Sequence, residues 1–296
     1  MNTSHPKVGI VVLNWNAYEL TVECLESLYN LDYPSYEFYL VDNASTDGSY
    51  ERLAEKFKNC EVILNPSNLG YAGGVNAGIK KALENKCSYI WLVNNDAKIL
   101  NPLALSALVT ACEKDKTIGA AGSLIKYPTG EIQFSGGKIQ LPLVKGIHFE
   151  EQLTEIVETE YVTGCSLLIP KHVVQKVGLI SEDYFLYYED ADYCKRIKDA
   201  GYKCVVVPGS LLEHELGGTS KKSPSLNYVY YNLRNRFLFS YRWLNNFQFI
   251  VFLLFTTIET LLRSVRYIML GRKDSLKYLL QAYSDGFKKK PGKFII

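Results

Sequence analysis

The stretch YIWLVNNDA, residues 89–97, decides the fold and indicates where a functional site lies. It begins with an apolar, β-prone run and changes abruptly to two asparagines and an aspartate. Such a run is typical of a strand that is buried on both faces of a sheet. In open α/β folds ligands bind at the edge where parallel strands end. Asn94, Asn95 and Asp96 are therefore candidate site residues.

Similar apolar runs precede this stretch and alternate with segments of helical pattern. The runs cover residues 8–13, 37–41 and 61–64, and the helical segments lie near 18–30, 47–57, 72–84 and 102–113. This alternation predicts an α/β fold with a mostly parallel central sheet flanked by helices. Further along, the sequence predicts strands at 161–170 and 204–208 and, between them, a helix at 189–203.

Composition narrows the classes of function. The 296 residues carry 33 basic and 31 acidic side chains, a net charge of +2, so we expect no nucleic-acid partner. Seven scattered cysteines without a C-x-x-C pair argue against a zinc cluster or a disulfide framework. Because the first residues also lack the pattern of a signal peptide, we expect a cytoplasmic protein.

The last third of the sequence, residues 226–296, is expected to form a helical region with a character of its own. Its apolar run at 247–258 is shorter than the roughly 20 residues that span a bilayer. A helix on the membrane surface fits better, with cations facing anionic headgroups. These cations are Arg263, Arg266, Arg272 and Lys288–Lys290. Packing on the rest of the chain, or a homodimer interface, is the alternative.

The first two strands also end in polar residues. The first is followed by Asn14, Trp15 and Asn16, and the second ends at Asp42. A carboxylate here is either a helix cap or an acceptor for the imide N–H of a uracil or thymine ring. The STDGS stretch at 45–49 is a capping sequence, so Asp42 remains the candidate for the base, with Trp15 as a wall.

Glycines follow the third strand in NLGYAGGVNAG, residues 68–78, where the backbone either turns sharply or approaches a ligand. A dinucleotide fingerprint would need its glycines directly after the first strand. The first strand here ends in NWN instead, which excludes a nicotinamide-dependent dehydrogenase.

Asp96 is well placed to bind a hard cation such as Mg²⁺ or Mn²⁺ if a diphosphate and water complete the coordination shell. Glu189, Asp190 and Asp192 either stabilise a helix start or include a general base for a hydroxyl group. His214 follows a strand and precedes Gly217–Gly218, a pair that would suit a loop over phosphates.

Taken in order, VVLNWN, LVDNASTDGS, NLGYAGGVNAG, WLVNNDA, VTGCSLLIP, FLYYEDADYCKRIKDAGY and EHELGGTS resemble the family 2 glycosyltransferases of the GT-A fold. The resemblance is strongest to the rhamnosyltransferase- and galactofuranosyltransferase-like branch, and it covers roughly residues 7 to 240. It implies a metal-dependent, inverting hexosyltransferase that moves a sugar from a nucleotide-diphosphate donor to an acceptor hydroxyl. On this reading residues 1–225 are the catalytic domain, with a donor half at 1–115 and an acceptor half at 116–225.

The resemblance also implies roles for single residues. Asp190 would be the general base, with Glu189 beside it, and Asp96 and His214 would hold the divalent metal. Donor binding would fall to Asn14, Trp15, Asn16, Asp42, Asn68, Gly70, Gly74, Asn94, Asn95 and Asp96. Thr163 and Gly164 would line the acceptor site, and Arg234 could meet an acceptor diphosphate unless it is only a cation on a helix surface.

One departure concerns the metal motif, because NND has Asn94 where the family has its first acidic residue. The donor is expected to be dTDP-L-rhamnose, in the assembly of a cell-surface polysaccharide on a glycan or lipid-linked acceptor. A UDP-hexose or UDP-galactofuranose donor, or a non-catalytic nucleotide-sugar-binding protein, is the alternative. A nucleotidylyltransferase would need a basic glycine-rich loop after its first strand, which NWNAYEL lacks.

Overall fold

A computed structural model describes residues 5–215 and 225–294 of the chain. The strands are β1 Val8–Asn14, β2 Tyr36–Asp42, β3 Glu61–Leu64, β4 Tyr89–Asn94, β5 Ala97–Ile99, β6 Ile118–Lys126, β7 Ile132–Phe134, β8 Gly137–Gln140, β9 Lys145–His148, β10 Val157–Thr159, β11 Ser166–Pro170 and β12 Lys203–His214. The helices are α1 Tyr18–Leu28, α2 Ser49–Lys56, α3 Gly70–Glu84, α4 Ala104–Lys114, α5 Lys171–Val177, α6 Glu189–Asp199, α7 Leu226–Trp243, α8 Asn246–Met269 and α9 Lys273–Phe287.

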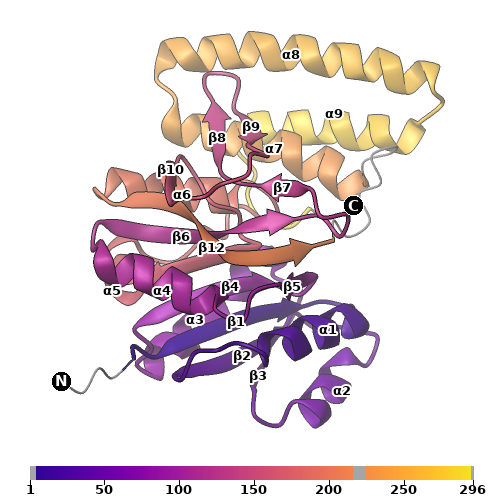
Figure 1. Ribbon diagram of the computed structural model, residues 1–296. Coiled ribbons are helices and arrows are strands. Elements are labelled where there is room, and N and C mark those ends of the chain that lie inside the picture. Colours follow the sequence, from indigo (N-terminus) through magenta and orange to yellow (C-terminus); the bar gives the residue numbers. More distant parts are fainter. Residues whose placement is uncertain (1–4, 216–224, 295–296) are drawn as a thin grey trace.

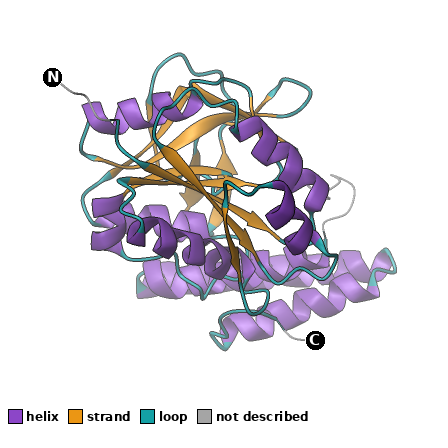
Figure 2. Cartoon of the chain, turned by 90° about the horizontal axis from the view of Figure 1, so that it is seen from below, coloured by secondary structure: helices purple, strands orange, loops and turns teal. Residues whose placement is uncertain are grey.

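β8 and β9 pair in a two-stranded sheet of their own, and the other strands form one large mixed sheet with helices on both of its faces (Figures 1 and 2). Its order is β10-β12-β6-β11-β4-β1-β2-β3. The first four strands of the chain pair in parallel, as their apolar runs predict. β11 runs antiparallel between β4 and β6, and β12 is parallel to β6. The predicted α/β class is therefore correct, and every antiparallel pair involves a strand that follows β4 in the sequence.

The register of β1 brings the functional ends of three strands to one edge of the sheet. Asn14 at the end of β1 lies opposite Asp42 at the end of β2, and Leu13 lies opposite Asn94 of β4. His214 is the last residue of β12, where it pairs with Ala97 of β5. The polar residues that interrupt the apolar runs are thus neighbours in space.

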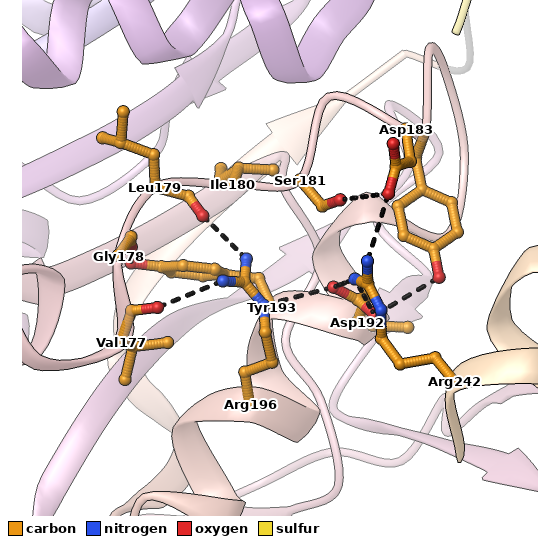
Figure 3. Close-up of polar contacts among 12 residues, drawn as sticks. Val177, Gly178, Leu179, Ile180, Ser181, Asp183, Asp192, Tyr193, Arg196 and Arg242 are labelled. Carbon is orange, nitrogen blue, oxygen red and sulfur yellow. Dashed lines mark hydrogen bonds and ion pairs between the residues drawn. The ribbon is translucent and has the colours of Figure 1, made fainter. Parts of the chain in front are cut away.

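The last three helices lie together beyond the β10 side of the sheet, with α8 outermost (Figure 1). Asp192 of α6 joins them to the rest of the protein (Figure 3). The Asp192 carboxylate is fully buried, and its two oxygens accept hydrogen bonds from Arg242 of α7 at 2.9 and 2.8 Å. One of these oxygens also accepts a hydrogen bond from the Trp243 indole at 2.9 Å. Arg196 of α6 donates to the carboxylate at 3.2 Å. The predicted boundary at residue 225 stays a prediction.

The apolar run 247–258 belongs to a longer helix than its sequence suggests. In the described residues α8 is the one helix that is long and apolar enough to cross a membrane by length and composition. Glu259, which ends the run in the sequence, turns inward to Arg236 at 3.1 Å and Lys145 at 3.2 Å. Hydropathy along the chain underestimates the apolar surface because this charge is paired inside the protein.

The two faces of α8 reverse the usual pattern of a surface helix. Its inward face carries the buried Thr256 and Thr260 beside Phe252. Its outward face is formed by large apolar side chains between 36% and 75% exposed, namely Phe247, Ile250, Leu254, Phe255, Ile258, Leu261, Leu262, Val265, Ile268 and Met269. A contiguous apolar face of this kind marks an interaction surface.

Candidate active site

A cavity of about 760 Å³ opens at the sheet edge where β4 and β12 end. Seven of the residues singled out in the sequence line it: Asn94, Asp96, Thr163, Gly164, Glu189, Asp190 and His214. They come from the ends of β4 and β12, from the segment before β11 and from the first turn of α6. The structure thus brings the predicted metal, base and acceptor residues into one space.

Asp96 and His214 face each other across this cavity, with Asp96 Oδ1 3.0 Å from His214 Nε2. Gln133 of β7 fixes the ring: its Nε2 donates to the His214 carbonyl at 3.0 Å, so its Oε1 must be the atom 2.7 Å from His214 Nδ1. An amide oxygen only accepts, so Nδ1 carries a proton. In the neutral ring, Nε2 then presents a lone pair to the carboxylate.

This arrangement fits a divalent cation. Asp96 Oδ1 is buried and has no hydrogen-bond donor, although the imidazole nitrogen is close. Two lone pairs at this distance need either a second ring proton or a cation between them. Nowhere in residues 5–215 and 225–294 do three His, Cys, Asp or Glu side chains gather around one point. A bound Mg²⁺ or Mn²⁺ would hence take most of its oxygen ligands from phosphate and water.

Two carboxylates of α6 enter the same cavity. Asp190 accepts from the backbone N–H of Gly164 at 3.2 Å and of Ala191 at 2.7 Å. Burial raises the pKa of Asp190, and these two N–H groups partly offset the rise. Glu189 is 7% exposed, and its Oε2 has no partner. Burial, and then repulsion from Asp190, raises the pKa of Glu189 well above its ordinary value. Such shifts are typical of functional carboxylates.

The turn before α6 has an unusual backbone. Tyr187 and Tyr188 have φ values of 70° and 73°, in the left-handed region that residues with a side chain avoid. Both line the cavity, as do Tyr71 and Tyr161. The Tyr71 hydroxyl donates to the Gly164 carbonyl at 2.7 Å, and burial followed by the charges of Glu189 and Asp190 keeps its pKa well above the usual range. The cavity thus combines carboxylates with aromatic walls.

A second cluster of predicted residues lies at the ends of β1 and β2, outside the lining of this cavity. Asn14 Nδ2 donates to Asp42 at 2.7 Å and to Ser49 Oγ at 2.9 Å. Ser45 donates to Asp42 from its backbone N–H and its hydroxyl, both at 2.8 Å. Asn14 and Asp42 are buried, so their hydrogen bonds stabilise the rim from inside and their side chains are not exposed there.

A chain of hydrogen bonds joins the two clusters. Asn95 Nδ2 donates to Thr21 Oγ1 at 2.9 Å, and Thr21 donates to Asn14 Oδ1 at 2.8 Å. Asn95 therefore points away from the cavity, whereas Asn94 and Asp96 on either side of it line the cavity. The NND sequence connects the metal-side residues to the β1 and β2 ends.

Trp15 and Asn16 stand at the rim of the strand-end cluster. Trp15 is 50% exposed, so its ring is available to stack on an aromatic ligand. Asn16 has a φ of 50°; its backbone N–H donates to Ser45 Oγ at 2.9 Å and its Oδ1 accepts from Thr46 N–H at 2.7 Å. These bonds hold the turn that presents Trp15 to solvent.

The glycine-rich segment acts mainly through packing. Gly70 has a φ of 76°, and a side chain there would collide with the Phe185 carbonyl. A side chain at Gly74 would collide with Leu13 of β1. Asn68 Oδ1 accepts from Gly70 N–H at 2.9 Å and from Asn43 Nδ2 at 3.1 Å. The segment lets α3 approach the sheet and the 185 loop closely.

The acceptor role predicted for Arg234 does not agree with its surroundings. Its side chain is 1% exposed and donates to the carbonyls of Lys290 at 2.7 Å and Gly292 at 2.9 Å. It is not among the residues that line the cavity, although Asn232 of the same helix is. Its sequence context, cations among aromatics, gave no signal that the C-terminal segment binds this side chain.

Gln133, His148 and the cavity tyrosines did not stand out in the sequence. Gln133 lies on a three-residue strand, and His148 ends β9, where its ring contacts Phe134 edge-on at 5.1 Å. Short strands carry little periodicity, so only the fold shows that these residues face Asp96 and Asp190. The predicted Gly217–Gly218 loop lies outside the described residues.

A sequence model of "Glycosyl transferase family 2" matches residues 9–178. The chain is 26% identical over 210 residues to N-acetylglucosaminyl-diphospho-decaprenol L-rhamnosyltransferase of Mycobacterium tuberculosis. The match covers 63% of this chain and 68% of that protein. The chain is 24% identical over 245 residues to dTDP-rhamnosyl transferase RfbF of Shigella flexneri, 76% of this chain and 80% of that protein.

Two solved structures are similar in fold. GalNAc-T7 with UDP, GalNAc and Mn²⁺ has a TM-score of 0.62 at 20% identity, over 77% of this chain, which spans only 48% of that one. Mannosyltransferase PcManGT from Pyrobaculum calidifontis, in complex with GDP-Man and Mn²⁺, has a TM-score of 0.59 at 18% identity, over 97% of this chain and 76% of that one. The expected GT-A type of α/β fold is thereby confirmed.

Proposed function

The chain belongs to glycosyl transferase family 2 and is a glycosyltransferase, and from that premise we propose that it moves L-rhamnose from dTDP-rhamnose to a hydroxyl of a glycan or lipid-linked acceptor. The acceptor would be part of a cell-surface polysaccharide. The names of the two rhamnosyltransferases to which the chain is similar support this donor.

One observation carries the proposal: Asp96 and His214 lie 3.0 Å apart in the cavity, and the carboxylate of Asp190, whose pKa is raised by burial, lines the same space. Asp96 and His214 suit a cation-bound diphosphate, and Asp190 suits a hydroxyl that must lose a proton. When bound, Mg²⁺ or Mn²⁺ would neutralise charge on the diphosphate leaving group. These groups support a nucleotide-sugar donor and a hydroxyl acceptor in the same cavity.

The protein's own residues would perform the rest of the reaction. Asp190 accepts the acceptor proton as the hydroxyl oxygen attacks the anomeric carbon, and the bond to the diphosphate oxygen breaks on the opposite face. The Gly164 and Ala191 N–H groups hold the Asp190 carboxylate in place. Glu189 is better suited to orient a sugar hydroxyl, because its buried unpaired oxygen needs a donor.

The strand ends would bind the nucleoside, with Trp15 against the base and the Asn14–Asp42 cluster supporting the rim. A UDP-hexose or UDP-galactofuranose donor is the second candidate. The chain is also 24% identical over 241 residues to the low-salt glycan biosynthesis hexosyltransferase Agl10 of Haloferax volcanii, whose name states a hexose but no nucleotide.

Calorimetric titration of the purified protein with dTDP and UDP, with and without Mn²⁺, tests the donor site. We expect binding that requires Mn²⁺ and is lost in Asp96→Ala, with a preference for dTDP. Tighter binding of UDP would favour the second donor class. Failure of both nucleotides to bind in the presence of Mn²⁺ would contradict the proposed donor site.

The base is tested by Asp190→Asn, which preserves shape and removes the proton acceptor. Nucleotide binding should persist while transfer from dTDP-rhamnose falls about 10²–10⁴-fold. Asp199→Asn, at the exposed far end of the same helix, is the matched control and should keep full turnover. Retained transfer by Asp190→Asn would remove Asp190 from the mechanism.

The outward apolar face of α8 supports a peripheral position at the cytoplasmic face of a membrane. Of the cations expected from the sequence, Arg266, Arg272 and Lys288–Lys290 flank this region and would meet anionic headgroups, whereas Arg263 lies 3.9 Å from Glu259. The seven cysteines, free and buried, suit a reducing compartment. A homodimer through the same face is the competing explanation.

Co-sedimentation with vesicles separates the two explanations. The protein should bind phosphatidylglycerol vesicles more strongly than phosphatidylcholine vesicles, and Leu261→Glu/Leu262→Glu should weaken binding to both. Light scattering on the same samples gives the oligomeric state. A dimer that the double substitution dissociates, without any vesicle binding, would assign the face to self-association.

A further inference from the structure

The geometry points to Asn235 of α7 as a positioning residue of the active site. Its side-chain amide holds the backbone of the turn from which Glu189 and Asp190 enter the cavity. Asn235 is fully buried, and its Nδ2 donates to the carbonyls of Leu186 at 2.8 Å and Tyr187 at 2.7 Å. The inference rests on the proposed role of Asp190 as the base.

The turn needs such a restraint because its backbone is unfavourable. Tyr187 and Tyr188 both adopt left-handed φ angles, and α6 begins at the next residue. Residues other than glycine keep such conformations only where the surroundings enforce them, and these sites cluster at functional positions. If the turn relaxed, the first turn of α6 and its two carboxylates would change direction.

The other contacts of the turn hold its ends and the ring of Tyr187, which lies edge-on to Tyr228 with the ring centroids 5.4 Å apart. The Phe185 carbonyl accepts from Tyr71 N–H at 2.8 Å, and the Phe185 ring stacks on Tyr231 at 5.1 Å. The Tyr188 hydroxyl donates to the Val144 carbonyl at 2.7 Å. Asn235 holds the two carbonyls between these anchors.

An amide is required at this position. Both contacts are to carbonyl oxygens, so the group must supply two N–H donors, as the Asn235 NH₂ does. Its Oδ1 is buried without a partner. An unpaired buried oxygen has a free-energy cost that an apolar residue would avoid, so the side chain is explained by its donors rather than by its shape.

The neighbouring residues provide matched controls. Arg234 and Arg236 are almost as buried as Asn235 and also donate to backbone carbonyls, but to other segments. Arg234 binds the carbonyls of Lys290 and Gly292, and Arg236 binds that of Leu143. All three side chains help to dock α7, whereas Asn235 alone among them donates hydrogen bonds to the turn before α6.

The experiment compares Asn235→Asp and Asn235→Ala with Arg234→Met in the full-length protein. The first readout is cleavage by chymotrypsin after residues 185–188, followed by mass spectrometry, and it needs no substrate. Loss of two hydrogen bonds should speed cleavage there about tenfold or more in both Asn235 variants. Arg234→Met should leave this rate within about twofold of the original protein.

The second readout is transfer from dTDP-rhamnose as a function of pH, together with calorimetric binding of dTDP and Mn²⁺. The Asn235 variants should lose about tenfold or more in kcat, with a shifted acidic limb and unchanged nucleotide affinity. Arg234→Met should keep the kcat and the pH profile.

Unchanged cleavage in both Asn235 variants would overturn the inference, and so would equal effects in Arg234→Met, which would indicate general loosening of α7. Unchanged kcat despite faster cleavage would likewise overturn it. If the original protein transfers no rhamnose, the proposed function fails, and cleavage alone then decides whether Asn235 holds the turn.

Discussion

The first turn of α6 presents carboxylates to two different regions of the molecule. Glu189 and Asp190 face the cavity, where one oxygen of Glu189 has no partner. Asp192 faces the C-terminal helices and accepts hydrogen bonds from Arg196 and Arg242 (Figure 3). It also accepts hydrogen bonds from Trp243 and Tyr184. A paired buried carboxylate stabilises the fold, whereas an unpaired one in a cavity is available to a ligand.

The largest expected effect breaks the paired side of this comparison. Asp192→Ala leaves the charges of Arg242 and Arg196 without their partner between α6 and α7, and should lower the free energy of unfolding by about 3 kcal/mol. Chemical denaturation measures it. Asp183→Ala removes the exposed contact of the same Arg242 and should cost less than about 1 kcal/mol. Equal costs would mean that Asp192 does not anchor α7.

A smaller effect sharpens the cavity side. Gln133→Leu removes the acceptor of His214 Nδ1–H, so the ring loses its fixed tautomer, and Mn²⁺ affinity in the presence of dTDP should fall about 10–100-fold. Calorimetric titration with Mn²⁺ measures this change. Gln133→Glu keeps an acceptor and should retain most of the affinity, as should Gln152→Leu on the exposed loop. A full Mn²⁺ affinity in Gln133→Leu would show that His214 is not a ligand.

The smallest effect has the opposite sign. Burial raises the folded-state pKa of Glu189 above its unfolded value of about 4.3, so the folded protein binds this proton more tightly. The stability that comes from this tighter proton binding is present at a pH below the unfolded-state pKa of Glu189. It is lost as the pH rises through the folded-state pKa of Glu189. Glu189→Gln should therefore stabilise the protein at pH 8 by roughly 1 kcal/mol and give little change at pH 4.

Thermal unfolding at both pH values checks this sign. A melting temperature at pH 8 that is equal to or below that of the original protein would mean that Glu189 is stabilised by its surroundings. Glu189 would then be a structural carboxylate like Asp192, and it would not be available to a ligand in the cavity.

Much of the fold was predictable because it is encoded in local patterns. The parallel strands β1–β4 follow from apolar runs of known length, and the polar residues that end them mark the edge where the cavity lies. Asp96 and His214 were candidates by their type and their place after a strand, whereas the family resemblance singled out Asp190 among three acidic residues at the start of α6. The antiparallel strands β7–β10 were too short for periodicity to predict their pairing.

Partners of buried charges were not predictable. Arg234 was expected to meet an acceptor diphosphate, and Asp192 to stabilise a helix start or to be one of three candidates for the base. Arg234 instead donates to a carbonyl 56 residues away, and Asp192 accepts from Arg242, 50 residues away. Glu259 seemed to end an apolar segment, although its charge is neutralised by Arg236 and Lys145 inside the protein. Contacts over such separations leave no periodic signal in the chain.

The sequence by itself determined the α/β architecture and the edge of the sheet at which chemistry is placed, because strand periodicity and strand-end residues are local properties. The order of its motifs indicated the family by resemblance. Only the tertiary structure decided which carboxylates are paired, which tautomer Gln133 gives His214, and which face of α8 is apolar and exposed. These depend on groups that meet after the chain has folded, when burial removes water and leaves each charge with the partners that the packing provides.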